Sequence, residues 1–234
     1  MENKIVKWLA LKLRESKCRG FVIGVSGGID SAVAAALSFK ASKKTLALIM
    51  PCESEANDLQ DALKLVKKFK IPYKIIRLEK PYFAIKKLLP VKLSRVAAGN
   101  LKARLRMLIL YSFANSGNAL VVGCGNKTEL KFGYFTKYGD GAADILPLGN
   151  LVKSEVRKAA QKLGIPSSII KKPPSAGLWK GQTDEKEIGL SYDILDGILK
   201  NISSIKKLDR TGRKKAETLL IRGAHKMRLP EICK

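Results

Sequence analysis

The stretch that decides the fold is "FVIGVSGGIDSAVAAAL", residues 21–37. Its first five residues form a continuous apolar run, which is typical of a buried strand, and the alanine-rich segment from Ser31 predicts a helix. Between them lie Ser26, Gly27 and Gly28, and glycine lets a backbone turn tightly and bring its N–H groups close to a ligand. Because the positive end of the helix also points there, the turn predicts an anion-binding cradle.

Asp30 lies inside this predicted cradle. A carboxylate would repel a bare phosphate, so its position indicates a metal ion between carboxylate and phosphate oxygens, and magnesium suits that arrangement best. The plainer interpretation is that Asp30 caps the helix. The usual phosphate loop is absent, since no Gly-Lys pair occurs in the chain, and the dinucleotide fingerprint is also missing at this strand.

Further apolar runs predict three more strands, at residues 45–51, 73–78 and 119–123. They alternate with predicted helices at residues 3–17, about 57–69 and about 100–114. Short continuous apolar strands that alternate with helices indicate a parallel sheet covered on both faces, so we expect an α/β fold with a parallel sheet flanked by helices.

The second half of the chain predicts a helical C-terminal extension. A polar, glycine-spaced loop follows the fourth strand, and a helix is expected near 154–163. Asp184 and Glu187 are placed to cap a helix that runs to about Lys200, and a last helix is expected near 212–226. We expect one domain over 1–234, with a nucleotide-binding core at about 18–170, a lid loop at 171–185 and C-terminal helices at 186–234.

The composition bounds the class of protein and its partners. The formal net charge of +25 favours polyanionic partners, either nucleic acid or phosphate-rich small molecules, but the lysines are scattered, so no dedicated nucleic-acid segment is expected. Four cysteines without a C-x-x-C pair and one histidine make a zinc site improbable. Lysines and an arginine interrupt the first apolar stretch, and Asp30 interrupts the one membrane-like window, so we expect no membrane association and a cytoplasmic location.

A family resemblance extends this interpretation. "SGGIDS" after a strand resembles the pyrophosphate loop of the N-type ATP pyrophosphatases. Six further motifs resemble, in their order along the chain, those of ammonia-dependent NAD synthetases: "NLKARLRM" (100–107), "GNKTE" (125–129), "GYFTKYGD" (133–140), "ADILPLGNLVKSEVR" (143–157), "PPSAGL" (173–178) and "HK" (225–226).

The resemblance implies an amidation in two steps. The carboxylate of deamido-NAD attacks the α phosphorus of ATP, pyrophosphate leaves, and ammonia then displaces AMP to give NAD. It also implies a Rossmann-like fold of the adenine nucleotide alpha hydrolase kind, magnesium as the cofactor and a homodimer. The length leaves no room for the glutaminase domain that some relatives carry, so ammonia is expected from outside the chain.

The resemblance also implies roles for particular residues. The residues for catalysis are Asp30, Glu129, Lys153 and Asp140, and those for magnesium are Asp30 and Glu129. The residues for ATP are Gly24, Val25, Ser26, Gly27, Gly28, Ile29, Asp30, Ser31, Cys124, Lys153 and Ser175. The residues for deamido-NAD are Arg104, Lys137, Asp144, His225 and Lys226.

One of these positions can also be argued from the fold alone, and another departs from the family pattern. Glu129 follows the carboxyl end of the fourth strand and could face Asp30 across the sheet. Cys124 stands where the family usually has threonine, so the ATP contact there would lose a hydroxyl.

Plainer interpretations stay open at this point. Glu129 could be a solvated loop acid, Lys153 a surface lysine, Arg104 the polar face of a helix and His225 a helix cap. For the whole chain, the main alternative is a tRNA-modifying, thiolase-type ATP pyrophosphatase, which the charge favours. The third interpretation is a non-catalytic nucleic-acid-binding module that uses the last basic helix.

Overall fold

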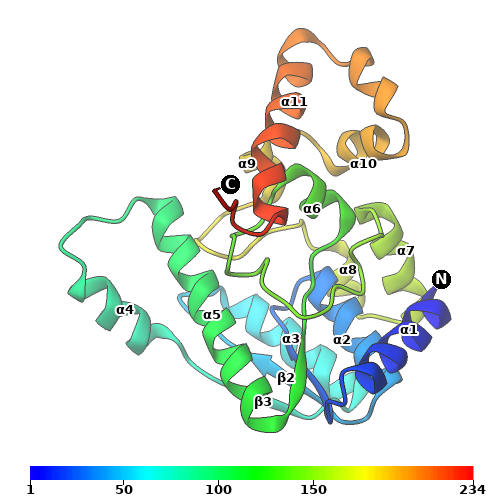
Figure 1. The fold of residues 1–234 in the computed structure, drawn as a ribbon, viewed down its shortest axis with the longest axis vertical. Coiled ribbons are helices and arrows are strands. Elements are labelled where there is room, and N and C mark those ends of the chain that lie inside the picture. Colours follow the sequence, from blue (N-terminus) through cyan, green and yellow to red (C-terminus); the bar gives the residue numbers. More distant parts are fainter. Residues whose placement is uncertain (234) are drawn as a thin grey trace.

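The computed structural model describes residues 1–233, apart from the side chain of Arg222 (Figure 1). Its centre is a four-stranded parallel sheet in the order β3-β2-β1-β4, made of β1 (Gly20–Gly24), β2 (Thr45–Ile49), β3 (Tyr73–Ile75) and β4 (Ala119–Val122). Since β1 pairs with β2 on one side and with β4 on the other, the segments that follow β1 and β4 leave the sheet side by side.

Helices cover both faces of the sheet, as the alternating pattern predicts. On one face the core contains residues of α1 (Glu2–Glu15), α2 (Ile29–Ala41), α3 (Ala56–Phe69), α7 (Lys153–Leu163) and α8 (Ser167–Lys171). On the other face it contains residues of α4 (Glu79–Leu88) and α5 (Arg95–Gly117).

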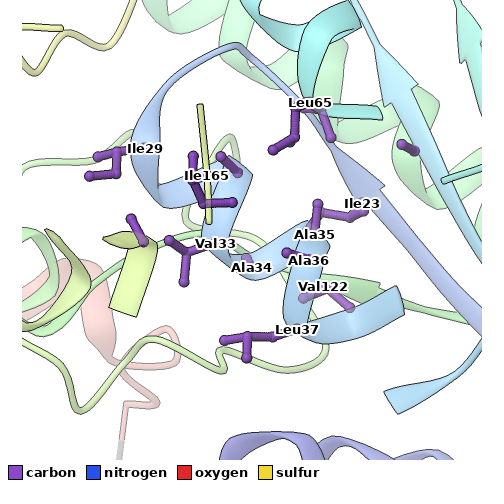
Figure 2. Packing of buried hydrophobic residues seen from close by; sticks show 14 of the residues in the cluster. Ile23, Ile29, Val33, Ala34, Ala35, Ala36, Leu37, Leu65, Val122 and Ile165 are labelled. Carbon is purple, nitrogen blue, oxygen red and sulfur yellow. The ribbon is translucent and has the colours of Figure 1, made fainter. Parts of the chain in front are cut away.

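The helix α2 is buried along nearly its whole length. Figure 2 labels Val33, Ala34 and Leu37 on this helix, and each of the three is 0% exposed. Its run of alanines removes bulk, so the helix can approach the sheet closely without voids. Truncation of Leu37 to alanine in such a core would cost about 2–5 kcal/mol. This packing fixes the N-terminus of α2 at the carboxyl end of β1.

The helices after residue 183, together with α6, form a second cluster in the upper part of Figure 1. It contains α6 (Lys127–Phe132), α9 (Asp184–Ile188), α10 (Tyr192–Lys200), the 3₁₀ helix η1 (Ile202–Lys207), α11 (Arg210–Ala224) and the 3₁₀ helix η2 (His225–Met227). Gly133 and Gly223 meet between α6 and α11, and a Cβ built on Gly133 would lie 2.2 Å from the Gly223 Cα. The two glycines let α11 come close enough to bring the end of the chain to the sheet.

Several predicted elements differ from those observed. The single helix expected from Asp184 to about Lys200 is broken, because Gly189 adopts φ +71° and ends α9. Asp184 is the first residue of α9 and does not cap it. The short helix α6 lies inside the segment expected to be a loop, and α4 was not expected. Within residues 1–233, none of the helices combines the length and the apolar run that a membrane span needs.

Candidate active site

A cavity of about 420 Å³ opens at the carboxyl ends of β1 and β4. Its wall includes the turn after β1, the start of α6 and the first residue of α7, together with the loop 171–185. In open parallel sheets ligands bind beyond the carboxyl ends of the strands. The cavity therefore occupies the place that the fold favours for a ligand.

The turn after β1 is held by its own hydroxyl groups. Ser31 Oγ donates to Gly28 O (2.9 Å), and the N–H groups of Ser26 and Gly28 reach Ser31 Oγ and Ser26 Oγ, each at 3.2 Å. Gly27 has φ +86°, and a Cβ there would lie 2.3 Å from the Asp58 carbonyl oxygen. Among the described residues no side chain caps α2, so its first N–H groups face the cavity wall.

Asp30 and Glu129 converge on one buried cation. Lys153 Nζ donates to Asp30 Oδ2 (2.5 Å) and to Glu129 Oε1 (3.1 Å), and Lys153 is only 2% exposed. The ammonium also lies 4.7 Å from the centre of the Tyr192 ring. Asp30 is therefore not a helix cap, Glu129 is not a loop acid in bulk solvent, and Lys153 is not a surface lysine.

Asn126 fixes the geometry of both carboxylates. Its Nδ2 donates to Asp30 Oδ1 (2.8 Å), and its Oδ1 accepts from the N–H of Glu129 (3.0 Å). The carboxylate of Glu129 accepts in turn from the N–H of Asn126 (3.2 Å), which completes a capping box at the start of α6. The local sequence Asn-x-x-Glu thus both begins the helix and aims Glu129 into the cavity.

The backbone of Lys153 is anchored by Asp196 of α10. This buried carboxylate accepts from Thr128 Oγ1 (2.6 Å) and from the N–H groups of Lys153 (3.2 Å) and Ser154 (2.8 Å). An acid near a helix N-terminus is stabilised by the helix dipole. The C-terminal helix cluster therefore positions a residue of the cavity.

Burial shapes the titration of these groups. Desolvation raises the pKa of Glu129 to about 7, although attraction to Lys153 opposes this. Burial by itself would lower the pKa of Lys153, but attraction to Asp30 and Glu129 outweighs it, and the pKa of Lys153 is raised. Perturbed groups in a cavity are typical of functional sites.

The residues present suit a magnesium ion that binds together with a phosphate ligand. The carboxylates of Asp30 and Glu129 both point at one position, and the Lys153 ammonium occupies it. Within residues 1–233, no group of three or more His, Cys, Asp or Glu side chains could hold a metal by itself. Magnesium is usually held by one or two carboxylates, with waters and substrate phosphates completing its ligands, so the pair Asp30 and Glu129 fits it.

Other predicted residues also lie in the cavity wall: Cys124, Asp140, Ser175 and Lys226. Cys124 Sγ points to the Gly24 carbonyl oxygen (3.7 Å), so it lies between the ends of β1 and β4. Asp140 Oδ1 accepts from the N–H of Thr136 (2.9 Å). These residues, like those of the turn, are brought together by the fold.

Gly27 of the turn does not itself line the cavity, and the four remaining predicted residues lie outside the lining in two places. Arg104 donates to the carbonyl oxygen of Lys137 (3.3 Å), and Lys137 Nζ donates to that of His225 (3.2 Å), so these three are neighbours. Asp144 bonds elsewhere, to Tyr111 Oη (3.1 Å) and to the Val121 N–H (2.7 Å).

Sequence reasoning missed two residues of the site. Asp184, expected to cap a helix, is 3% exposed and lines the cavity. Tyr192 Oη donates to Asp184 Oδ2 (2.9 Å) and lies 3.4 Å from Glu129 Oε1. The one local signal was that Asp184 falls within the predicted lid loop 171–185, a segment rich in proline, glycine and polar residues.

The segment 171–185, predicted to be a lid, lines the cavity and is held from both sides. Lys172 Nζ pairs with Asp58 of α3 (2.8 Å), and Lys102 Nζ of α5 donates to the Leu178 carbonyl oxygen (2.8 Å). From Lys172 to the start of α9 the chain forms no helix or strand. Side-chain contacts rather than regular structure therefore hold this segment.

Comparison with known proteins identifies the family. The family model for NAD synthase matches residues 1–230. The chain belongs to the NAD synthase family. It is 44% identical over 242 residues to the NH₃-dependent NAD⁺ synthetase of Carboxydothermus hydrogenoformans, an alignment that covers 98% of this chain and 95% of the relative.

Solved structures of the family superpose over nearly the whole chain. The NH₃-dependent NAD synthetase of Campylobacter jejuni, in complex with a nitrate ion, gives a TM-score of 0.85 at 33% identity, covering 100% of this chain and 97% of that one. The NMN synthetase of Francisella tularensis gives a TM-score of 0.94 at 42% identity, covering 99% and 96%. The activity of this NAD synthase family member is ammonia-dependent NAD synthesis, which makes it a ligase, and the tRNA-modifying alternative is not favoured.

Proposed function

We propose that the cavity binds ATP on the turn 24–31, with magnesium held by Asp30 and Glu129, for the ATP-dependent amidation of deamido-NAD. The observation that carries this proposal is the convergence of both carboxylates on Lys153 Nζ, at 2.5 and 3.1 Å, beside the uncapped N-terminus of α2. Backbone N–H groups and the positive helix end suit the phosphates. When bound, magnesium supplies positive charge to the phosphate oxygens.

The proposed amidation takes place in two steps, in which side chains of this protein have different roles. In the first, the nicotinate carboxylate oxygen bonds to the α phosphorus and pyrophosphate leaves. Lys153, released from its carboxylate partners, pairs with the developing charge on the phosphate oxygens. In the second, the nitrogen of ammonia bonds to the acyl carbon and AMP leaves. Cys124, Ser175 and Asp140 line the cavity in which both steps take place.

The acceptor is proposed to extend beyond the cavity. A volume of about 420 Å³ is typical of a site for one small ligand, so ATP and a dinucleotide do not both fit inside. Arg104 and Lys137 form a cationic edge that continues through the backbone of His225 to Lys226, which reaches the cavity wall. We propose that deamido-NAD lies along this edge and that Asp144 contributes from the end of β4.

A homodimer would complete this edge. Exposed apolar side chains on the same helix as Arg104, Val96 (53% exposed) and Leu108 (56% exposed), support a second copy packing on α5. We also propose that the chain divides into a core at 18–170, a lid at 171–185 and C-terminal helices at 186–234. We further propose a cytoplasmic location, which suits the free thiols of Cys18, Cys52 and Cys124.

A second candidate is amidation of the mononucleotide acid to NMN. The observation that favours it is the likeness to the NMN synthetase of Francisella tularensis, with a TM-score of 0.94 and 42% identity. The chemistry at the carboxyl group is the same for both acceptors. The acceptors differ in that only deamido-NAD carries an adenosine half, which would occupy the edge near Arg104.

One assay tests both candidates. The protein is incubated with ATP, magnesium and ammonium, and with either deamido-NAD or nicotinate mononucleotide. We expect NAD, AMP and pyrophosphate from the first acceptor, and Arg104→Ala should raise the KM for deamido-NAD. A higher kcat/KM for the mononucleotide, unchanged by Arg104→Ala, would favour the second candidate. ADP and phosphate as products would contradict both.

A further inference from the structure

A buried carboxylate in the cavity wall has no role in the chemistry described so far. Within residues 1–233, Asp184 Oδ1 is the buried side-chain oxygen without a hydrogen-bond partner, and Asp184 is 3% exposed. Its other oxygen, Oδ2, accepts from Tyr192 Oη (2.9 Å). Buried polar atoms in folded proteins almost always have a partner, so an unpaired carboxylate oxygen at the wall of a cavity indicates a missing ligand.

The charges around Asp184 favour a cation. Lys153 Nζ pairs with Asp30 and Glu129, and the carboxylate of Asp184 in the same cavity wall attracts this ammonium too, so three acids share one positive charge. The pKa of Asp184 is raised, first by burial, while attraction to Lys153 works against that rise. If Asp30 and Glu129 take a magnesium ion and Lys153 turns to a phosphate, Asp184 is left without its nearest positive charge.

The hydrogen-bonding groups beside Asp184 favour a ligand that only donates. A tyrosine hydroxyl has one proton, and both nearby tyrosines have used theirs: Tyr192 donates to Asp184, and Tyr134 donates to Glu187 Oε2 (2.9 Å). Gln182 Nε2 also donates to Glu187 Oε2 (2.8 Å). The hydroxyl lone pairs and the free oxygen of Asp184 are therefore acceptors, which match a small cation with four N–H donors.

We propose that Asp184, with the Tyr134 and Tyr192 hydroxyls beside it, binds the ammonium ion and accepts one proton from it, which leaves ammonia with a free electron pair to attack the acyl carbon in the second step. This inference rests on the proposed function. Tyr192 Oη lies 3.4 Å from Glu129 Oε1, so the site adjoins the proposed metal and phosphate site. The Asp184 N–H donates to the Pro174 carbonyl oxygen (3.0 Å), which ties the site to the lid loop, so closure of that loop would enclose the ion with the adenylated acceptor.

The test separates the two steps in the variant Asp184→Asn, which keeps the side-chain shape and removes the charge. We expect the KM for ammonium to rise about tenfold or more, the scale of a lost charge-assisted hydrogen bond, with the KM for ATP within about twofold of wild type. A single-turnover burst of pyrophosphate without ammonium should keep its amplitude. Hydroxylamine, a nucleophile that is neutral near pH 7, should be used at close to the wild-type rate.

The control is Asp193→Asn, which makes the same change at an exposed residue of the next helix and should alter none of these values. An ammonium KM within about twofold of wild type in Asp184→Asn would overturn the inference. So would a pyrophosphate burst that falls in parallel with amidation, because this would indicate a structural role.

A measurement on the wild-type protein covers the case in which Asp184→Asn does not fold. Potassium should then inhibit in competition with ammonium, while tetramethylammonium at equal ionic strength should not. Absence of competition by potassium would overturn the inference. If the wild-type protein forms no amide from either acceptor, the proposed function itself fails; if it forms the amide and these tests fail, only the ammonium site does.

Discussion

Glu129→Gln should make the protein more stable at alkaline pH while it removes activity. Glutamine keeps the shape of Glu129 and can complete the same capping box with Asn126. What it removes is a carboxylate whose burial raises its pKa from 4.5 to about 7. Turnover should be lost, because one of the two proposed magnesium ligands is gone.

The magnitude follows from proton linkage. The unfolded chain loses the Glu129 proton near pH 4.5 and the folded chain near 7, so between these values the folded chain binds more protons and its stability falls as pH rises. At 1.36 kcal/mol per pKa unit, the full effect is about 3 kcal/mol. Glutamine does not titrate, so the variant lacks this fall. Coupling to Lys153 divides the effect between two groups, and we expect the variant to be about 1–3 kcal/mol more stable near pH 8.

Chemical denaturation at about pH 5 and about pH 8 measures this difference. The gap in unfolding free energy should be small at the lower pH and should open in favour of Glu129→Gln at the higher. In thermal melts it corresponds to about 3–10 °C, since 1 kcal/mol shifts the melting temperature by about 2–4 °C at this chain length. The matched control is Glu155→Gln, at the same helix position in α7, where Oε2 accepts from the Val152 N–H (2.9 Å) away from the cavity. A gap equal at both pH values, or a Glu129→Gln variant less stable near pH 8, would refute the reasoning.

Three other variants probe the turn and the lid. Asp30→Asn should abolish pyrophosphate release while the circular dichroism spectrum stays that of wild type, and normal turnover would contradict a metal-binding role. Gly27→Ala should lose ATP binding and about 1–2 kcal/mol or more of stability, because φ +86° strains a Cβ that would also lie 2.3 Å from the Asp58 carbonyl; a wild-type melting temperature would count against this. Lys172→Met should release the lid from Asp58, which raises the KM for ATP and speeds proteolysis near Lys180; unchanged cleavage with and without substrates would exclude the lid.

The strand pattern was sufficient to predict the sheet and the edge at which its cavity opens. Strands at four apolar runs, separated by helices, leave little choice except a parallel sheet, and in it the turn after β1 must lie at the carboxyl edge. Position 129 follows β4, which pairs with β1, so its approach to Asp30 is a consequence of topology. The start of α6 was also readable in principle, because Asn126 and Glu129 have the spacing of a capping box.

The place of Asp184 could not be read in the same way. Its contact with Tyr192 depends on the chain reversing at Gly189 between α9 and α10, and acids at this spacing before an apolar run are just as typical of one continuous capped helix. The approach of α11 to α6 depends on a pair of glycines 90 residues apart, Gly133 and Gly223, which no local pattern connects. Both are tertiary effects, and both bring the C-terminal helices to the cavity.

The charge of the chain and the charge of its cavity have opposite signs, and the chemistry needs both. The formal net charge is +25, yet the buried Lys153 pairs with the carboxylates of Asp30 and Glu129, and Asp184 lines the same cavity. A strongly cationic surface attracts polyanions such as ATP from a distance and raises their rate of encounter. In the proposed site the same substrates meet a magnesium ion and an ammonium ion at short range, and both cations would be held by carboxylates. The buried Lys153 partly neutralises Asp30 and Glu129 before any ligand is bound. The two acids can therefore stay close together in the folded chain until ATP binds.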